Sequence, residues 1–140
     1  MDFRVNISKS SQGIYKGLTG SGSVFPQFSD MFFWCVVLAY SNKLDRKPIL
    51  KKEGVFEWKA FDTNKQMPVL KMIAVAEHGD FSILDKDSTE SLNTFRDIIE
   101  QYSEAGLSLL LEKFDEQNMI TSDALFSLLV AEIQKVKKPN

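Results

Sequence analysis

One short segment of the 140-residue chain groups residues that could do chemistry. Glu77, His78 and Asp80 place two carboxylates and the only imidazole within four residues, and such groups serve general acid–base catalysis or metal binding. A hydrolase or nuclease could be built on them. The same segment is also typical of a helix end, because Gly79 and a following Asp favour a cap and a turn. We favour this structural role over catalysis.

A lone cysteine and a glycine-rich loop are the other two candidates for reactive or cofactor-binding sites. Cys35 lies within the apolar run of residues 31–40, where we expect a small buried hydrophobe rather than a thiolate nucleophile. Residues 17–23, GLTGSGS, precede a helix but match neither GxxxxGK[ST] nor GxGxxG. One Cys and one His also exclude a disulfide framework and a multi-cysteine or two-histidine zinc site. The sequence therefore predicts no catalytic residue, no cofactor, no metal site and no enzymatic activity.

A basic loop within residues 41–54 is the best candidate for contacting another molecule. Five cations fall within ten residues and are opposed only by Asp45: they are Lys43, Arg46, Lys47, Lys51 and Lys52. Such a loop could bind nucleic-acid phosphates in a salt-dependent, sequence-independent way. A pI of about 5.4 and the lack of a helix-turn-helix or zinc-finger motif favour instead a solvated loop or a contact with an acidic protein.

Charge is distributed unevenly along the chain. The net charge is −2, yet residues 1–60 hold nine Lys/Arg against five Asp/Glu, a balance of +4. Residues 61–140 hold eight against fourteen, a balance of −6. This pattern allows one face to attract anions and another face, in the acidic C-terminal part, to attract a basic partner.

Helices are predicted to position these residues. Apolar residues recurring every three and four positions predict helices over residues 10–18, 26–41, 66–78, 88–115 and 123–137. The second is apolar nearly all round and the third is apolar on two faces, so we expect both to be mostly buried.

Two local features refine this prediction. Asp87 and Glu90 resemble a capping box at the start of the fourth helix, with Asp87 as the cap. Gly106 falls on the apolar stripe of the same helix, which predicts either a close approach by another helix or a break. Residues 55–61 could form a short strand or one helical turn. Between residues 48 and 61 the pattern allows at most a very short β-hairpin, in which residues 55–61 pair with the segment around Ile49.

The chain is therefore expected to be all-α, a compact bundle of about five helices. We expect a single domain over residues 1–140, with residues 1–24 a partly flexible N-terminal segment. No secretory signal is visible in residues 1–12, and the run 31–40 is half the ~20 residues that a membrane span needs. These features predict a cytoplasmic protein without a membrane partner.

Aromatic residues are concentrated in the first half of the chain. Most should be core, but a five-helix domain of this size has limited capacity to cover them all. Aromatic side chains often anchor protein interfaces. The residues proposed for a partner interface are Phe25, Phe28, Phe33, Trp34 and Trp58.

Five short segments occur in an order that resembles a known family. They are Leu38-Ala39-Tyr40, Lys47-Pro48, Trp58-Lys59-Ala60-Phe61, Ile73-Ala74-Val75-Ala76-Glu77 with Asp80, and Tyr102-Ser103-Glu104-Ala105-Gly106-Leu107. The ordered set is similar to dnd system-associated protein 4, a family of small proteins found beside DNA phosphorothioation (dnd) gene clusters, and the resemblance extends over roughly residues 24–131. The resemblance implies a prokaryotic defence locus against phage or plasmid DNA, and it implies no catalytic residue.

Two functions follow as expectations. The first is a non-catalytic accessory subunit of a multi-protein bacterial defence complex, which contacts a larger ATPase or nuclease subunit, as the family resemblance implies. The second is an adaptor that contacts DNA through the basic loop.

Overall fold

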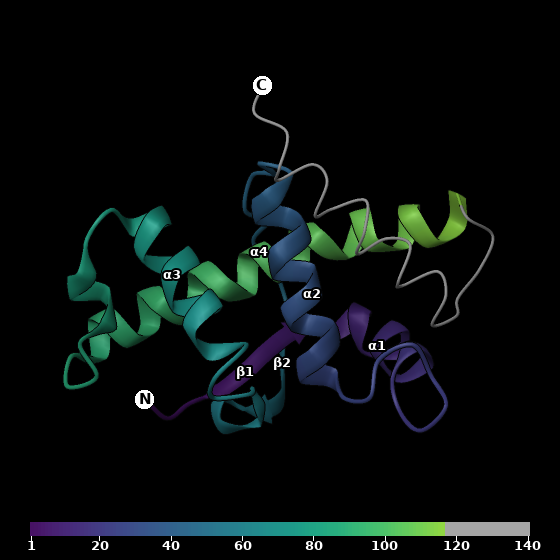
Figure 1. The fold of residues 1–140 in the computed structure, drawn as a ribbon, viewed down its shortest axis with the longest axis horizontal. Coiled ribbons are helices and arrows are strands. Elements are labelled where there is room, and N and C mark those ends of the chain that lie inside the picture. The colour runs from purple at the N-terminus through teal and green to yellow at the C-terminus, as the bar shows by residue number, and fades with distance from the viewer. Residues whose placement is uncertain (117–140) are drawn as a thin grey trace.

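The computed structural model describes residues 1–116, and every element below lies in this part of the chain (Figure 1). The α-helices are α1 (Gln12–Leu18), α2 (Phe28–Ser41), α3 (Met67–His78) and α4 (Thr89–Glu116). The strands are β1 (Arg4–Ser8) and β2 (Lys52–Glu57), and the 3-10 helices are η1 (Lys9–Ser11), η2 (Trp58–Ala60) and η3 (Phe81–Leu84). The four α-helices match the first four predicted ones, and the helix predicted over residues 123–137 lies outside the described residues.

The crossing of α2 and α4 organises the fold. Figure 1 shows α4 along the long axis of the molecule, with α2 crossing it steeply. Gly106 lies at this crossing, where a Cβ added to it would sit 2.6 Å from the carbonyl carbon of Cys35 and closer still to its oxygen. Only glycine allows the two backbones to come this close. The close approach is thus confirmed, and α4 continues through Gly106 without a break.

A small antiparallel sheet joins the N-terminus to the middle of the chain. β1 pairs with β2 in a register that runs from Arg4 opposite Glu57 to Ser8 opposite Lys52, with an irregularity after Val5. The prediction of a hairpin near residues 48–61 was therefore wrong, because the partner of β2 lies some 50 residues earlier in the chain. The domain is mostly helical rather than purely α.

The core is rich in aromatic side chains that come from segments far apart in the described chain. Trp58 is stacked on Phe3, with ring centroids 5.4 Å apart, and meets Phe95 of α4 edge-on at 5.4 Å. Phe61 lies against both Trp58 and Phe32 of α2. The residue that precedes β1, together with η2, α2 and α4, is thus held in one aromatic cluster.

The start of α4 differs by one residue from the prediction. The hydroxyl of Ser88 accepts the Ser91 N–H at 3.2 Å, and the Ser88 carbonyl accepts the Leu92 N–H at 3.0 Å. Ser88, and not Asp87, is therefore the N-cap, because it makes the bond to the third helical residue that defines a cap.

Among the described helices, none is both long enough and apolar enough to span a membrane.

Candidate protein interface

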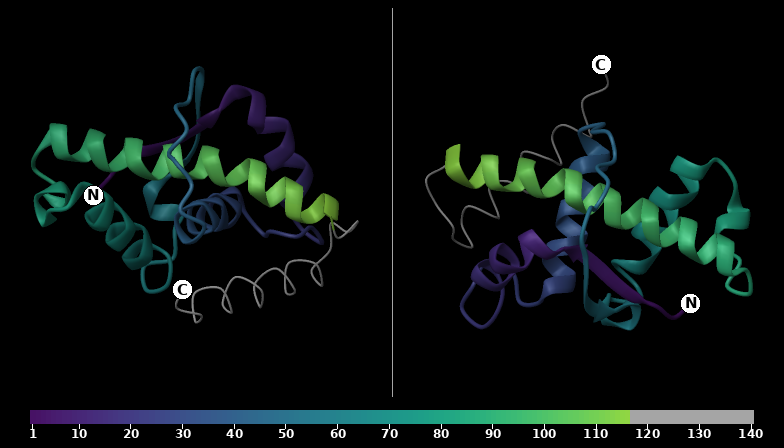
Figure 2. Two further views of the ribbon diagram at one scale, coloured as in Figure 1. Left: turned by 90° about the horizontal axis from the view of Figure 1, so that it is seen from above. Right: turned by 180° about the vertical axis from the view of Figure 1, so that it is seen from behind.

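The basic loop leaves the end of α2 and passes across α4 before it enters β2 (Figure 2). The Lys47 N–H donates to the Gln101 carbonyl of α4 at 3.1 Å, and the Lys9 N–H donates to the Lys51 carbonyl at 2.8 Å. Lys43 begins the loop with a φ of 56°. These backbone bonds hold the loop against α4 and η1.

Ion pairs engage two of the five predicted cations. Arg46 Nε lies 3.5 Å from Glu77 Oε1 of α3, and Lys52 Nζ lies 3.3 Å from Asp97 Oδ1 and 3.4 Å from Glu100 Oε1 of α4. Arg46 and Lys52 therefore help to fasten the loop to the domain.

The remaining three cations are exposed. Lys43, Lys47 and Lys51 have no ion-pair partner within the part of the chain that the structure describes. The fold adds an exposed fourth, Lys9, whose backbone bonds that of Lys51. Sequence reasoning missed Lys9 because only the β1–β2 pairing brings it to the loop.

A polar cluster joins α2, α3, α4 and the basic loop. The Tyr102 hydroxyl donates a hydrogen bond to Glu77, which also pairs with Arg46. The ring of Tyr40 meets that of Tyr102 edge-on, with centroids 5.8 Å apart. Burial, and then the Glu77 carboxylate, raises the pKa of Tyr102 to about 12. Glu77 is therefore a structural link between elements.

Replacing Tyr102 tests this link. We expect Tyr102→Phe to lower the free energy of unfolding by about 1–2 kcal/mol at pH 8, because Glu77 loses its hydroxyl donor. Since the folded-state pKa is raised, the stability contributed by the phenol is full below pH ~10 and is lost as the pH rises through about 12. The difference in free energy of unfolding between wild type and variant, measured by urea unfolding, should therefore shrink from pH 8 to pH 11.5. A constant or growing difference would contradict the structural role of the Tyr102 hydroxyl.

The other predicted acid–base groups also have structural geometry. Gly79 ends α3 with a φ of 89°, and Asp80 caps η3 by accepting the Ser82 N–H at 2.6 Å. That bond lowers the pKa of the Asp80 carboxyl, while His78 is exposed. Among the described residues, no three His, Cys, Asp or Glu side chains gather as metal ligands would.

Cys35 is enclosed at the α2–α4 crossing. Burial raises the pKa of its thiol to about 12, which leaves almost no thiolate near neutral pH. We expect an aromatic disulfide reagent at pH 8 to label the folded protein at least about 100-fold more slowly than the urea-unfolded protein. Absorbance of the released thiol gives the rate. Fast stoichiometric labelling of the folded protein would show that the thiol is accessible.

The aromatic residues proposed for a partner interface fall into two groups. Phe25 and Trp58 are only 1% and 3% exposed and belong to the core. Phe28, Phe33 and Trp34 are half-buried on α2, and Phe28 also lies against the Tyr15 ring at 5.4 Å. In this conformation only the α2 group can offer surface to a partner.

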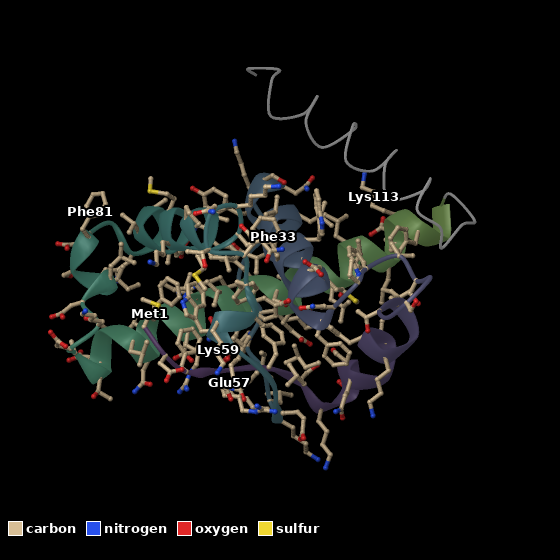
Figure 3. The ribbon with its side chains drawn as sticks, turned by 60° about the horizontal axis from the view of Figure 1, so that its bottom comes forward. Met1, Phe33, Glu57, Lys59, Phe81 and Lys113 are labelled. Atoms are coloured by element: carbon tan, nitrogen blue, oxygen red, sulfur yellow. The ribbon has the colours of Figure 1, made fainter. Side chains whose placement is uncertain are left out.

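An apolar surface on α3 and η3 was not among the predicted sites. Val69, Met72 and Ala76 recur every three and four residues, so they share one face of α3, and Phe81 follows in η3. Met72 is 59% and Phe81 68% exposed, with Val69 at 38% and Ala76 also exposed. Figure 3 shows Phe81 at one extremity of the molecule. We call these four residues the α3–η3 apolar face.

This surface corrects one prediction. The helix over 66–78 was expected to be mostly buried, but only one of its apolar faces is covered, chiefly through Leu70, Ile73 and Ala74. The sequence signal was the second apolar face itself. Periodicity shows that a face exists, whereas only the tertiary arrangement shows whether the domain covers it.

Acidic side chains follow directly along the chain. Residues 80–90 carry four carboxylates against the single Lys86, a net charge of −3. All four are exposed, and they form what we call the acidic rim: Asp80, Asp85, Asp87 and Glu90.

Comparison with known proteins places the chain in a family. The family model of DNA sulphur modification system-associated protein 4 matches residues 4–140. The chain belongs to this family. The match confirms the resemblance seen in the sequence, and neither a curated protein nor a solved structure matches the chain.

The segments that suggested the DNA sulphur modification system-associated family have structural positions in this member. Tyr40, Glu77 and Tyr102 meet in the polar cluster. Trp58 lies in the aromatic core, and Gly106 in the α2–α4 crossing. These residues tie elements together, while the α3–η3 apolar face and the exposed lysines of the basic loop are accessible to solvent.

Proposed function

We propose that this chain is a non-catalytic accessory subunit of a multi-protein bacterial defence complex against phage or plasmid DNA. It works in the cytoplasm by binding a larger ATPase or nuclease subunit of its DNA sulphur modification system. Family membership supports the association with the system. The observation that carries the proposed mode of action is the α3–η3 apolar face, where Met72 and Phe81 are more exposed than buried.

Physical chemistry favours a partner over solvent for this face. Burying apolar surface contributes roughly 25 cal/mol per Å², and exposed apolar side chains that cluster mark interaction sites. Met and Phe are also enriched where proteins meet. The half-buried aromatic residues of α2, Phe28, Phe33 and Trp34, offer a further contact, as does the acidic C-terminal part of the sequence.

Two observations support a non-catalytic role. Glu77 and Asp80 are engaged by Tyr102, Arg46 and the Ser82 N–H, so they are poorly placed to exchange protons with a substrate. Cys35 is buried and holds its proton.

Co-expression tests the proposed function. The tagged chain is produced together with the other proteins of the same sulphur modification system and passed over a sizing column. We expect it to co-elute with a subunit that carries an ATPase or nuclease activity, whereas the chain produced alone has none. Elution of the chain by itself under all combinations would refute the accessory role.

An adaptor that contacts DNA is the second candidate. The observation in its favour is that four exposed lysines lie together in the basic loop and the adjoining η1 without an ion-pair partner in residues 1–116: Lys9, Lys43, Lys47 and Lys51. Arg46 and Lys52, also predicted for this contact, are shared with acidic partners.

Charge reversal distinguishes this candidate. If DNA is bound, Lys43→Glu, Lys47→Glu and Lys51→Glu together should weaken binding and reduce the slope of log K against log salt by about 0.9 per lost phosphate contact. Lys59→Glu, an exposed lysine on η2 outside the loop, is the matched control. Gel shifts that are unchanged in the triple variant would exclude DNA contact through this loop.

A further inference from the structure

We propose that the α3–η3 apolar face docks a helical segment of a partner protein that has one apolar face flanked by Lys and Arg side chains. This inference rests on the proposed function and names the chemistry of the partner segment. Its basis is the set of exposed apolar side chains on α3 and η3 together with the exposed carboxylates that flank η3 in the chain.

The shape of the face indicates a helix as the occupant. Val69, Met72 and Ala76 run along about two turns of α3, and Phe81 is exposed at the start of η3, which follows the end of α3 after Gly79 and Asp80. An amphipathic helix packs on such a line with side chains at positions i, i+3 or i+4, and i+7. Met72 is unbranched and adapts to the facing side chains.

The charge of the chain segment that contains Phe81 indicates a basic partner. Asp80, Asp85, Asp87 and Glu90 lie within ten residues of Phe81 in the chain, and only Lys86 opposes them. Charges at the rim of an interface steer encounter and select partners. An anionic membrane surface or nucleic acid would be repelled by the same carboxylates, so the acidic rim favours a protein.

A second copy of this chain fits less well. Two apolar faces brought together would also bring two acidic rims together. The basic loop, where Leu50 is 94% exposed between lysines, could approach the face of another copy. That contact is head-to-tail, and such contacts form open chains unless the rotation closes a ring.

Peptide binding tests the inference directly. Overlapping 20-residue peptides that cover all other proteins of the same sulphur modification system are immobilised and incubated with the full chain. We expect the bound peptides to have apolar residues at helical spacing and a net positive charge. Met72→Ser with Phe81→Ser should weaken this binding at least about 50-fold, and the triple variant Asp85→Asn, Asp87→Asn, Glu90→Gln about 10-fold at 0.05 M salt and little at 0.5 M salt.

Leu50→Ser is the matched control, because it removes a more exposed apolar side chain from a different surface. All substituted side chains are exposed or at the surface, so circular dichroism should show wild-type folding. Failure to bind any basic amphipathic peptide, or equal binding by the Met72/Phe81 variant, would overturn the inference. So would self-association of the wild type that Leu50→Ser abolishes. Co-elution of whole subunits together with such a negative result would leave the proposed function standing.

Discussion

Gly106→Ala is expected to destabilise the folded domain by at least about 3 kcal/mol, the upper range for an overpacked core. The added Cβ would lie 2.6 Å from the carbonyl carbon of Cys35, so α2 and α4 would have to move apart. Both contacting groups at this point are backbone, and no side-chain rotation can relieve the overlap. The helix propensity of Ala, about 1 kcal/mol better than Gly, offsets only part of this cost.

Urea unfolding followed by circular dichroism measures the effect. Gly17→Ala is the matched control, since Gly17 also lies in a helix and its added Cβ would meet no atom within 4 Å. The control should be neutral or slightly stabilised. Equal stability of wild type and Gly106→Ala would mean that the two helices do not approach as closely as described.

Glu100 is the second site with a large expected effect. Its side chain is fully buried, and one carboxylate oxygen accepts the Asn6 N–H at 2.7 Å and the Asn6 side-chain amide at 3.0 Å. The other oxygen lies 3.4 Å from Lys52 Nζ. Glu100 thus links α4 to both strands. Glu100→Ala should cost about 3 kcal/mol at pH 7, because the Asn6 N–H and side-chain amide lose their acceptor and a cavity is left in the core.

The pH dependence separates charge from hydrogen bonding at this site. Burial raises the pKa of Glu100, against the opposing effects of the Asn6 N–H and Lys52. The folded state therefore binds this proton more tightly than the unfolded state. The resulting stability is full below the unfolded pKa of about 4.3 and is lost as the pH rises through the raised folded value.

Glu100→Gln keeps an oxygen acceptor for Asn6 but does not titrate. Relative to this variant, the wild type should gain stability when urea unfolding is repeated at pH 5 instead of pH 7. If the difference in free energy of unfolding between wild type and Glu100→Gln does not depend on pH, or if the wild type is relatively less stable at pH 5, the Glu100 carboxyl is not buried in the folded state as described.

Local patterns in the sequence predicted the four described helices and the role of Gly106. Helical periodicity and a glycine on an apolar stripe both depend only on residues that are close together in the sequence. The cap of α4 was misplaced by one residue, since Asp87 and Ser88 are about equally good caps. The partner of β2 was missed although Phe3, Val5 and Ile7 alternate as in a strand. Pairing across some 50 residues depends on the whole fold.

The candidate interface was predictable only in part. The cations of the basic loop were found, but the pairing of Arg46 with Glu77 and of Lys52 with α4 joins segments that no spacing rule connects. Phe25 and Trp58 were proposed as anchors from residue type alone, and the core buries them. The exposure of Met72 and Phe81 depends on which face of α3 the domain covers, and that is decided by tertiary packing.

The central claim is that this chain binds a larger subunit through the α3–η3 apolar face. The most direct measurement purifies the tagged chain from its native host and quantifies the proteins that come with it, for wild type and for the Met72→Ser, Phe81→Ser double variant. We expect the wild type to retain a large subunit of its sulphur modification system, and the variant to retain less than about a tenth as much. Equal retention by the variant, or no such subunit with the wild type, would contradict the claim.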